Sequence, residues 1–137
     1  MFEWDDKYLV GDIFLDSEHK LLFAMAKRLS DALGQLSSDE FKTMLANIIE
    51  YTQVHFKHEE ELLQEIGWSE LSQHHEQHVR ILTEIKETIS STNKITTLEV
   101  KILRLLQKWI VDHIVHDDQQ FRSDLIRVRG FRKVDCK

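Results

Sequence analysis

The sequence predicts an all-α protein, an up-down-up-down antiparallel four-helix bundle with an N-terminal arm and a short C-terminal tail. Three observations lead to this prediction. The 137 residues include no proline and only 4 glycines, whereas a β-sandwich needs frequent turn residues. Apolar residues recur at alternating steps of three and four, the pattern of helices that bury one side in a bundle. Short polar segments separate these stretches, so consecutive helices should lie antiparallel.

The helix boundaries follow from glycines and capping residues. Gly34 and Gly67 end the first two helices, as glycine commonly does at a helix C-terminus. Capping signals begin the later helices: the boxes Ser37–Glu40 and Thr96–Glu99, and Ser69 before the third helix. We therefore expect helices at 17–34, 38–66, 69–90 and 97–117. They belong to one domain, residues 1–137, made of an arm (1–16), the bundle (17–118) and a tail (119–137).

Composition excludes several classes of protein. The 18 basic and 24 acidic residues give a net charge of −6, which disfavours nucleic-acid binding. No apolar run approaches the roughly 20 residues of a membrane-spanning helix. The first ten residues are too acidic for a signal peptide, and Cys136 has no second cysteine to pair with. We expect a cytoplasmic protein that neither binds nucleic acid nor inserts into a membrane.

Polar residues occupy the buried side of every predicted helix, at positions where the pattern requires leucine or isoleucine. They are His19 in the first helix, His55 and Glu59 in the second, His74 and His78 in the third, and His113 in the fourth. In an up-down bundle these positions lie at the same end, so the six side chains should meet. Imidazoles and carboxylates in a dry interior are metal ligands. Six such groups exceed the four ligands of a tetrahedral zinc, which favours two metals.

The motifs around these residues resemble those of hemerythrins, most closely single-domain bacteriohemerythrins, over residues 4–118. The matching segments are LDSEHKLLF around His19, HFKHEE around His55 and Glu59, HxxxH from His74 to His78, and WIVDHIVHDD around His113. The resemblance implies two iron ions (Fe2+/Fe3+) with an oxo or hydroxo bridge. It assigns His74, His78 and His113 to one iron, His19 and His55 to the other, and Glu59 and Asp118 as bridges between them. It leaves a vacant position on the iron with two histidines, where dioxygen would bind.

Asp118 is the residue whose placement depends most on local geometry. It follows His113 by five residues, so on a regular α-helix it would point about 140° away. The family spacing HxxxxD therefore predicts a local irregularity near 113–118, such as a π-bulge or a loosened last turn. If the helix is regular there, Asp117 is the better ligand.

Several charged residues are expected to lie outside the metal site. We expect His58, His75 and His116 to be no ligands, and Glu60 and Glu61 to form a solvated face. Glu18 either contacts a ligand histidine or is simply exposed. Residues 122–137 are rich in basic side chains and could dock an acidic partner, but a mobile end is the favoured expectation.

The function that the resemblance implies is reversible binding of dioxygen, for transport, storage or delivery. We expect no enzymatic activity, because the ligands are mostly neutral and no acid or base stands beside the vacancy. The alternatives are an oxygen or redox sensor that uses the same site, a di-iron protein that reacts with nitric oxide or peroxide, and a plain bundle with zinc or no metal. The polar residues on the buried side of the helices disfavour the last. Dioxygen is the expected partner, and the sequence indicates no particular protein partner.

Overall fold

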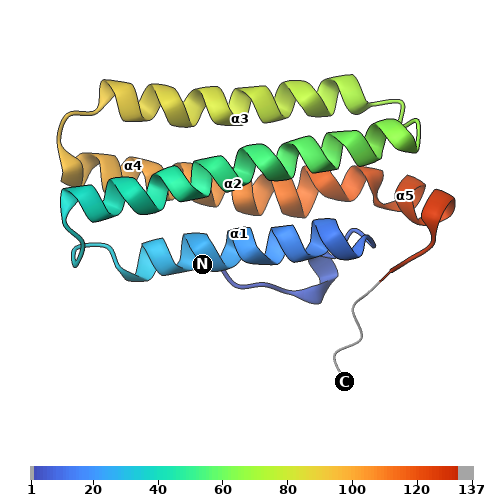
Figure 1. Cartoon of the computed structure of the whole chain (residues 1–137), viewed down its shortest axis with the longest axis horizontal. Coiled ribbons are helices and arrows are strands. Elements are labelled where there is room, and N and C mark those ends of the chain that lie inside the picture. Colours follow the sequence, from blue (N-terminus) through green and yellow to red (C-terminus); the bar gives the residue numbers. More distant parts are fainter. Residues whose placement is uncertain (1, 133–137) are drawn as a thin grey trace.

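The computed structural model describes residues 2–132 and places four long helices side by side with alternating direction (Figure 1). The helices are α1 (Ile13–Asp31), α2 (Ser38–Glu65), α3 (Leu71–Ser91) and α4 (Ile95–Leu106), the last of which continues into a π-helix (Gln107–Asp117). This arrangement confirms the predicted all-α, antiparallel four-helix fold. Within residues 2–132 no helix combines the length and the apolar character that crossing a membrane requires.

The helix starts agree with the sequence in part. The capping box of Ser37 and Glu40 is confirmed, with both reciprocal hydrogen bonds present at the start of α2. The other two capping predictions are wrong, because α3 begins at Leu71 and α4 at Ile95. In the described part of the chain neither helix has a side-chain hydrogen bond at its cap. The first helix begins earlier than expected, at Ile13, because the Asp12 carboxylate accepts hydrogen bonds from the next turn.

The end of the fourth helix is irregular, as the spacing of His113 and Asp118 predicts. The backbone is a π-helix from Gln107 to Asp117, followed by a 3-10 turn (Asp118–Phe121). The backbone N–H of Asp118 donates to the carbonyl of His113, five residues earlier. In a π-helix, residues five positions apart lie on the same face. The side chains of His113 and Asp118 therefore both point toward the interior. The prediction of an irregularity is confirmed, and the irregular stretch begins earlier than expected.

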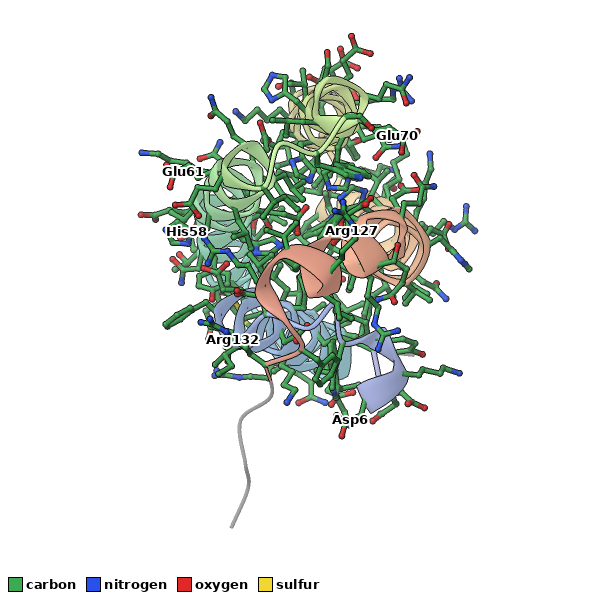
Figure 2. All side chains as sticks on the ribbon, turned by 90° about the vertical axis from the view of Figure 1, so that its right-hand side faces the viewer. Asp6, His58, Glu61, Glu70, Arg127 and Arg132 are labelled. Carbon is green, nitrogen blue, oxygen red and sulfur yellow. The ribbon has the colours of Figure 1, made fainter. Side chains whose placement is uncertain are left out.

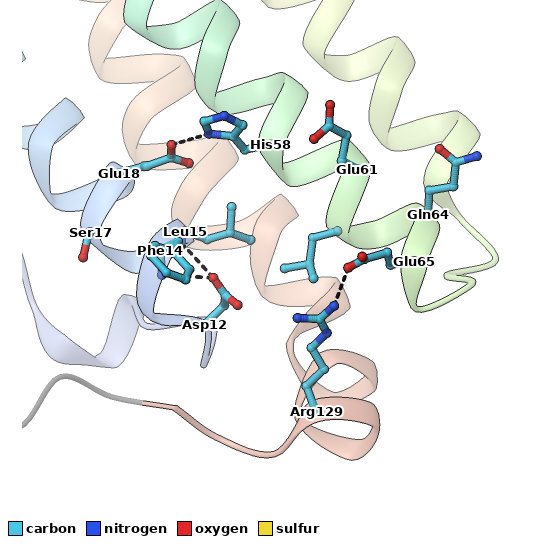
Figure 3. Close-up of a pocket in the computed structure, with 11 residues that line it drawn as sticks. Asp12, Phe14, Leu15, Ser17, Glu18, His58, Glu61, Gln64, Glu65 and Arg129 are labelled. Atoms are coloured by element: carbon cyan, nitrogen blue, oxygen red, sulfur yellow. Dashed lines mark hydrogen bonds and ion pairs between the residues drawn. The ribbon is translucent and has the colours of Figure 1, made fainter.

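The C-terminal segment closes one end of the bundle. Helix α5 (Arg122–Arg129) lies across this end, as the end-on view shows (Figure 2). Phe121 and Leu125, four residues apart, are buried there, and Arg129 pairs with Glu65 at the end of α2 (Figure 3). The expectation of a mobile end is therefore wrong for residues 122–132. The rest of that end, including Cys136, lies outside the described residues.

The N-terminal arm is fastened to both α1 and the C-terminal segment. The Asp16 carboxylate accepts hydrogen bonds from the backbone N–H groups of Val10, at 2.7 Å, and Gly11, at 3.2 Å. Gly11 has a φ of 97° and lies so close to Ile126 that a Cβ would stand 3.0 Å from its side chain. The carbonyl of Gly11 accepts from the backbone N–H of Arg132. The arm and the C-terminal segment thus hold each other against the bundle.

Replacing Asp16 with alanine should destabilise the fold by about 2 kcal/mol, because two buried backbone N–H groups lose a charged acceptor. Asp16→Asn should cost less, since the amide oxygen still accepts one bond. Urea unfolding of the metal-free protein measures the effect. Ser17→Ala, at the exposed neighbouring position, is the control. Equal unfolding midpoints for Asp16→Ala and the control would mean that Asp16 does not hold the arm.

Candidate metal centre

Seven buried polar side chains meet in the interior at the end of the bundle that α5 covers. They are His19, His55, Glu59, His74, His78, His113 and Asp118, the residues that the sequence singles out. Their potential ligand atoms form two groups, within each of which all atoms lie within 4.8 Å of one another. One group is Glu59, His74, His78, His113 and Asp118; the other is His19, His55, Glu59 and Asp118. We call them the three-histidine group and the two-histidine group. Their role as ligands stays a prediction.

The alternating helix directions bring these residues together. His19 lies near the start of α1, and His74 and His78 lie near the start of α3. His55 and Glu59 lie in the second half of α2, which runs the opposite way. His113 stands in the π-helix that extends α4. The starts of odd-numbered helices and the ends of even-numbered ones share one end of an up-down bundle, so all four helices contribute at one level.

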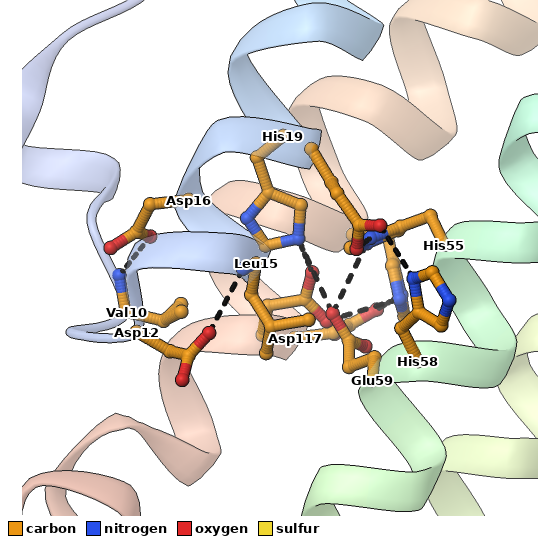
Figure 4. Close-up of polar contacts among 12 residues, drawn as sticks. Val10, Asp12, Leu15, Asp16, His19, His55, His58, Glu59 and Asp117 are labelled. Atoms are coloured by element: carbon orange, nitrogen blue, oxygen red, sulfur yellow. Dashed lines mark hydrogen bonds and ion pairs between the residues drawn. The ribbon is translucent and has the colours of Figure 1, made fainter.

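Glu59 and Asp118 belong to both groups. Figure 4 shows Glu59 reaching toward His19 and His55. Oε2 of Glu59 is 3.3 Å from Nε2 of both His19 and His55. Its Oε1 lies 2.6 Å from Nε2 of His74 and 3.1 Å from Nε2 of His78. Each oxygen of Glu59 therefore faces a different group.

The two carboxylate oxygens of Asp118 also face different groups. Its Oδ2 is 3.1 Å from Nε2 of His19, in the two-histidine group. Its Oδ1 is 3.0 Å from Nε2 of His74 and 3.1 Å from Nε2 of His113, in the three-histidine group. The π-helix makes this possible, because it places Asp118 on the same side as His113. Asp117 would have been the better ligand only in a regular helix, and because the helix is irregular here, Asp118 is the central carboxylate.

A second set of carboxylates lies behind three of the histidines. Nδ1 of His55 pairs with Glu18 at 2.9 Å, and Nδ1 of His78 pairs with Glu60 at 2.7 Å. Nδ1 of His113 pairs with Asp117 at 3.1 Å. An imidazole that donates from Nδ1 to a carboxylate presents the lone pair of Nε2 to a metal, in a fixed ring orientation. The outer carboxylates thus aim the three rings at the centre.

Apolar clusters enclose the seven residues on both sides. The main core packs on the inner side and includes Leu22, Phe56 and Trp109. A smaller cluster closes the outer end, and its buried members are Val10, Leu15, Leu62, Leu63, Trp68, Phe121 and Leu125. The ring of Phe56 stacks on His78 with centroids 3.7 Å apart and planes at 3°. The polar groups therefore sit in a dry, low-dielectric region, where they need a shared cation or proton.

The carboxylates hold protons on His19, His74 and His113 in the metal-free protein. Burial lowers the pKa of His19, but Asp118 and Glu59 outweigh this and raise it to about 10. The same balance raises the pKa of His113 to about 10 and that of His74 to about 9. Burial and Glu59 raise the pKa of Asp118, yet the neighbouring histidines outweigh them and hold it far below its usual range.

Metal binding near neutral pH should release protons, because a metal replaces the protons that these histidines carry. The raised histidine pKa values stabilise the metal-free fold fully below the unfolded pKa of about 6.5. This stabilisation is lost as the pH rises through the folded pKa values of about 9 to 10. A pH indicator in weak buffer measures the release on adding zinc, and urea midpoints at several pH values measure the stability. Zinc binding without proton release would contradict this charge balance.

The donor set fits iron. Nε2 of His55 and both carboxylate oxygens of Asp118 are buried, and among the described residues their polar neighbours at 3.0 to 3.3 Å do not have the geometry of hydrogen bonds. Nε2 of His78 and Nε2 of His113 face each other at 3.0 Å, an arrangement that a bound cation between them relieves. Imidazole suits iron, zinc and copper, and carboxylates shared between two groups are typical of iron centres in helical bundles.

Comparison with known proteins decides the family. The family described as the hemerythrin HHE cation binding domain matches residues 11–123. The chain belongs to the hemerythrin family. A bacteriohemerythrin of Campylobacter jejuni is 32% identical over 109 residues, which cover 77% of this chain and 81% of that protein. A hemerythrin-like protein of Naegleria gruberi is 25% identical over 124 residues, 90% of this chain and 93% of that protein. A myohemerythrin of Theromyzon tessulatum is 28% identical over 127 residues, again 90% and 93%.

Membership of the hemerythrin family and the buried cluster together indicate a non-haem iron site. His58 and His75, predicted to be no ligands, are exposed, with 51% and 57% of their side chains accessible. Neither they nor His116 belong to the two groups that the described residues form.

Sequence reasoning missed or misplaced three contributors to this hemerythrin site. Glu60 was expected on a solvated face, but it accepts hydrogen bonds from His78 and His75. Nothing in the sequence marks Phe56 as the ring beneath His78, since it simply follows His55. Asp117 does have a signal, its spacing of four from His113, but the structure uses it behind the ring rather than at the centre.

Proposed function

We propose that this protein binds dioxygen reversibly at a non-haem di-iron centre and serves to carry, store or deliver it. The observation that carries the proposal is the division of both central carboxylates. Glu59 and Asp118 each direct one oxygen to the two-histidine group and the other to the three-histidine group. This is the geometry that two bridging carboxylates need in order to join two metals.

The two groups differ in their number of donor residues, and this difference supports a binding position for dioxygen. Both groups share the same two carboxylates, so the group of His19 and His55 has one donor fewer. An iron held there would have one protein donor fewer and so room for an outside ligand, whereas His74, His78 and His113 would surround the other iron more fully. Bound iron supplies the electrons that hold dioxygen reversibly, as the family resemblance implies.

The surroundings favour binding over turnover. Leu15 lies one turn before His19, and Leu22 lies about one turn after it; both are buried. Leu62 is buried one turn beyond Glu59. These apolar side chains keep water away from the two-histidine group and provide no group that could pass a proton to bound dioxygen. We therefore propose a binding protein rather than an enzyme.

Metal content and the visible spectrum test the function. The purified protein is reduced without air, exposed to dioxygen and then returned to an oxygen-free atmosphere. We expect two irons per chain and an absorption band that forms with dioxygen and disappears on its removal. Iron that oxidises once and stays oxidised would instead favour a redox sensor or a protein that reacts with peroxide or nitric oxide. Freshly prepared protein that holds zinc or no metal would overturn the di-iron proposal.

A further inference from the structure

Two exposed histidines are connected to the buried metal site through shared carboxylates. Glu18 accepts from Nδ1 of His55, at 2.9 Å, with one oxygen and from Nδ1 of His58, at 2.6 Å, with the other. Glu60 does the same with Nδ1 of His78, at 2.7 Å, and Nδ1 of His75, at 2.5 Å. We call these two sets the Glu18 relay and the Glu60 relay. Each joins an exposed ring to a predicted metal ligand.

The two relays have the same construction. Each uses two histidines three residues apart on one helix and a glutamate from the neighbouring helix. The Glu18 relay joins α1 to α2 and ends in the two-histidine group, whereas the Glu60 relay joins α2 to α3 and ends in the three-histidine group. One relay therefore serves each half of the metal site.

Exposure increases along each relay from the interior to the surface. The side chains of His55 and His78 are 1% and 2% exposed. Glu18 is 13% exposed and Glu60 is 24% exposed. The outer rings reach solvent at surface pockets: His58 and Glu18 line one of about 680 Å³ (Figure 3), and His75 and Glu60 line another of about 430 Å³. The outer rings thus anchor glutamates that would otherwise have one oxygen free to rotate toward water.

We propose that Glu18 and Glu60 are positioning residues, one for each metal, and that His58 and His75 hold them in place. A carboxylate on Nδ1 keeps the proton there, leaves Nε2 free for the metal and makes the imidazole a stronger donor. A stronger donor holds the metal longer and favours the oxidised state of iron. The second hydrogen bond, from the exposed histidine, keeps the carboxylate in the orientation that this requires.

The experiment compares Glu18→Gln and Glu60→Gln with Glu61→Gln, an exposed position next to Glu60 on α2. Loss of iron to a chelator should become about 10 to 100 times faster for roughly half of the iron in each relay variant. The reduction potential of the iron should rise, because the ligand becomes a weaker donor. His58→Ala and His75→Ala should change both quantities in the same direction but less. Glu61→Gln should match the unchanged protein.

A second readout distinguishes the two halves of the site without iron chemistry. In zinc-loaded protein, the proton on Nδ1 of His55 should give a hydrogen-bonded NMR resonance that Glu18→Gln shifts and Glu60→Gln leaves in place. The resonance of His78 should behave in the opposite way. Relay variants that match Glu61→Gln in both iron loss and NMR would overturn the inference.

This inference rests on the metal site of the proposed function but not on dioxygen. If the unchanged protein binds no metal, the proposed function fails at its first step. If it binds metal and the relay variants keep it as firmly as the control, only the positioning role fails. Whether the unchanged protein binds metal therefore distinguishes the two failures.

Discussion

Asp118→Asn should abolish stable metal binding, whereas Asp117→Asn should weaken it much less, by about 10- to 100-fold at most. Both oxygens of Asp118 face Nε2 atoms at 3.0 to 3.1 Å, in both ligand groups. Asparagine keeps the size but replaces one oxygen by an N–H donor and removes the charge that offsets bound cations. Because even residues behind the ligands contribute about 10- to 100-fold to affinity, we expect more than about 100-fold weaker binding.

Asp117 is the matched control for this prediction. It is the preceding residue, its side chain is 34% exposed, and its Oδ2 lies behind His113, 3.1 Å from Nδ1. The amide of asparagine still offers an oxygen there but no charge, so the expected loss is that of the other outer carboxylates and smaller than that of Asp118→Asn. Metal per chain after competition with a chelator is the measurement, and circular dichroism of the metal-free variants checks that both stay helical. Equal retention in the two variants would refute the assignment of Asp118 and the role of the π-helix.

His74→Ala should likewise lose metal, whereas His75→Ala should keep it through purification. Nε2 of His74 lies 2.6 Å from Glu59 and 3.0 Å from Asp118, so its removal takes a donor from the three-histidine group. The neighbouring His75 is exposed and reaches only the outer side of the site, through Glu60. We expect more than about 100-fold weaker binding in the first variant and a smaller change in the second.

The cavity left by His74→Ala needs its own control, because the ring packs against Trp68 and Phe121. His74→Gln fills more of this space and should still lose metal, since the amide is a poor ligand for iron. Iron analysis and urea unfolding on the same preparations separate loss of metal from loss of fold. Full iron content in His74→Gln together with His75→Ala would refute the assignment of the third helix.

The residues on the buried side of the helices could be predicted, because apolar residues recur at a regular spacing on a helix face that is buried. An amphipathic helix repeats every three to four residues, so a polar residue in the apolar series stands out, as His55 and Glu59 do in α2. The family spacing of His113 and Asp118 predicted a local irregularity, because a residue five positions after His113 would point about 140° away on a regular α-helix. In both cases the signal lies within a single helix.

Residues on the outer faces were not predictable in the same way. Glu18 and His55 are 37 positions apart, and a glutamate that orients a ligand looks the same in sequence as one that faces water. Glu60 was misplaced for this reason. Residues 122–132 were misjudged because the apolar pair Phe121 and Leu125 is too short a pattern to stand out among basic residues.

The sequence by itself determined the helical bundle and the end at which the polar residues meet. Both follow from spacing along one helix together with the alternating direction of the helices, whereas the irregular turn before Asp118 was expected only from the family spacing. Only the tertiary structure decided which carboxylate lies behind which histidine, how Glu59 and Asp118 divide their oxygens between the two groups, and how α5 closes the site. These features depend on the rotation and approach of neighbouring helices, which side-chain packing sets and no local pattern encodes.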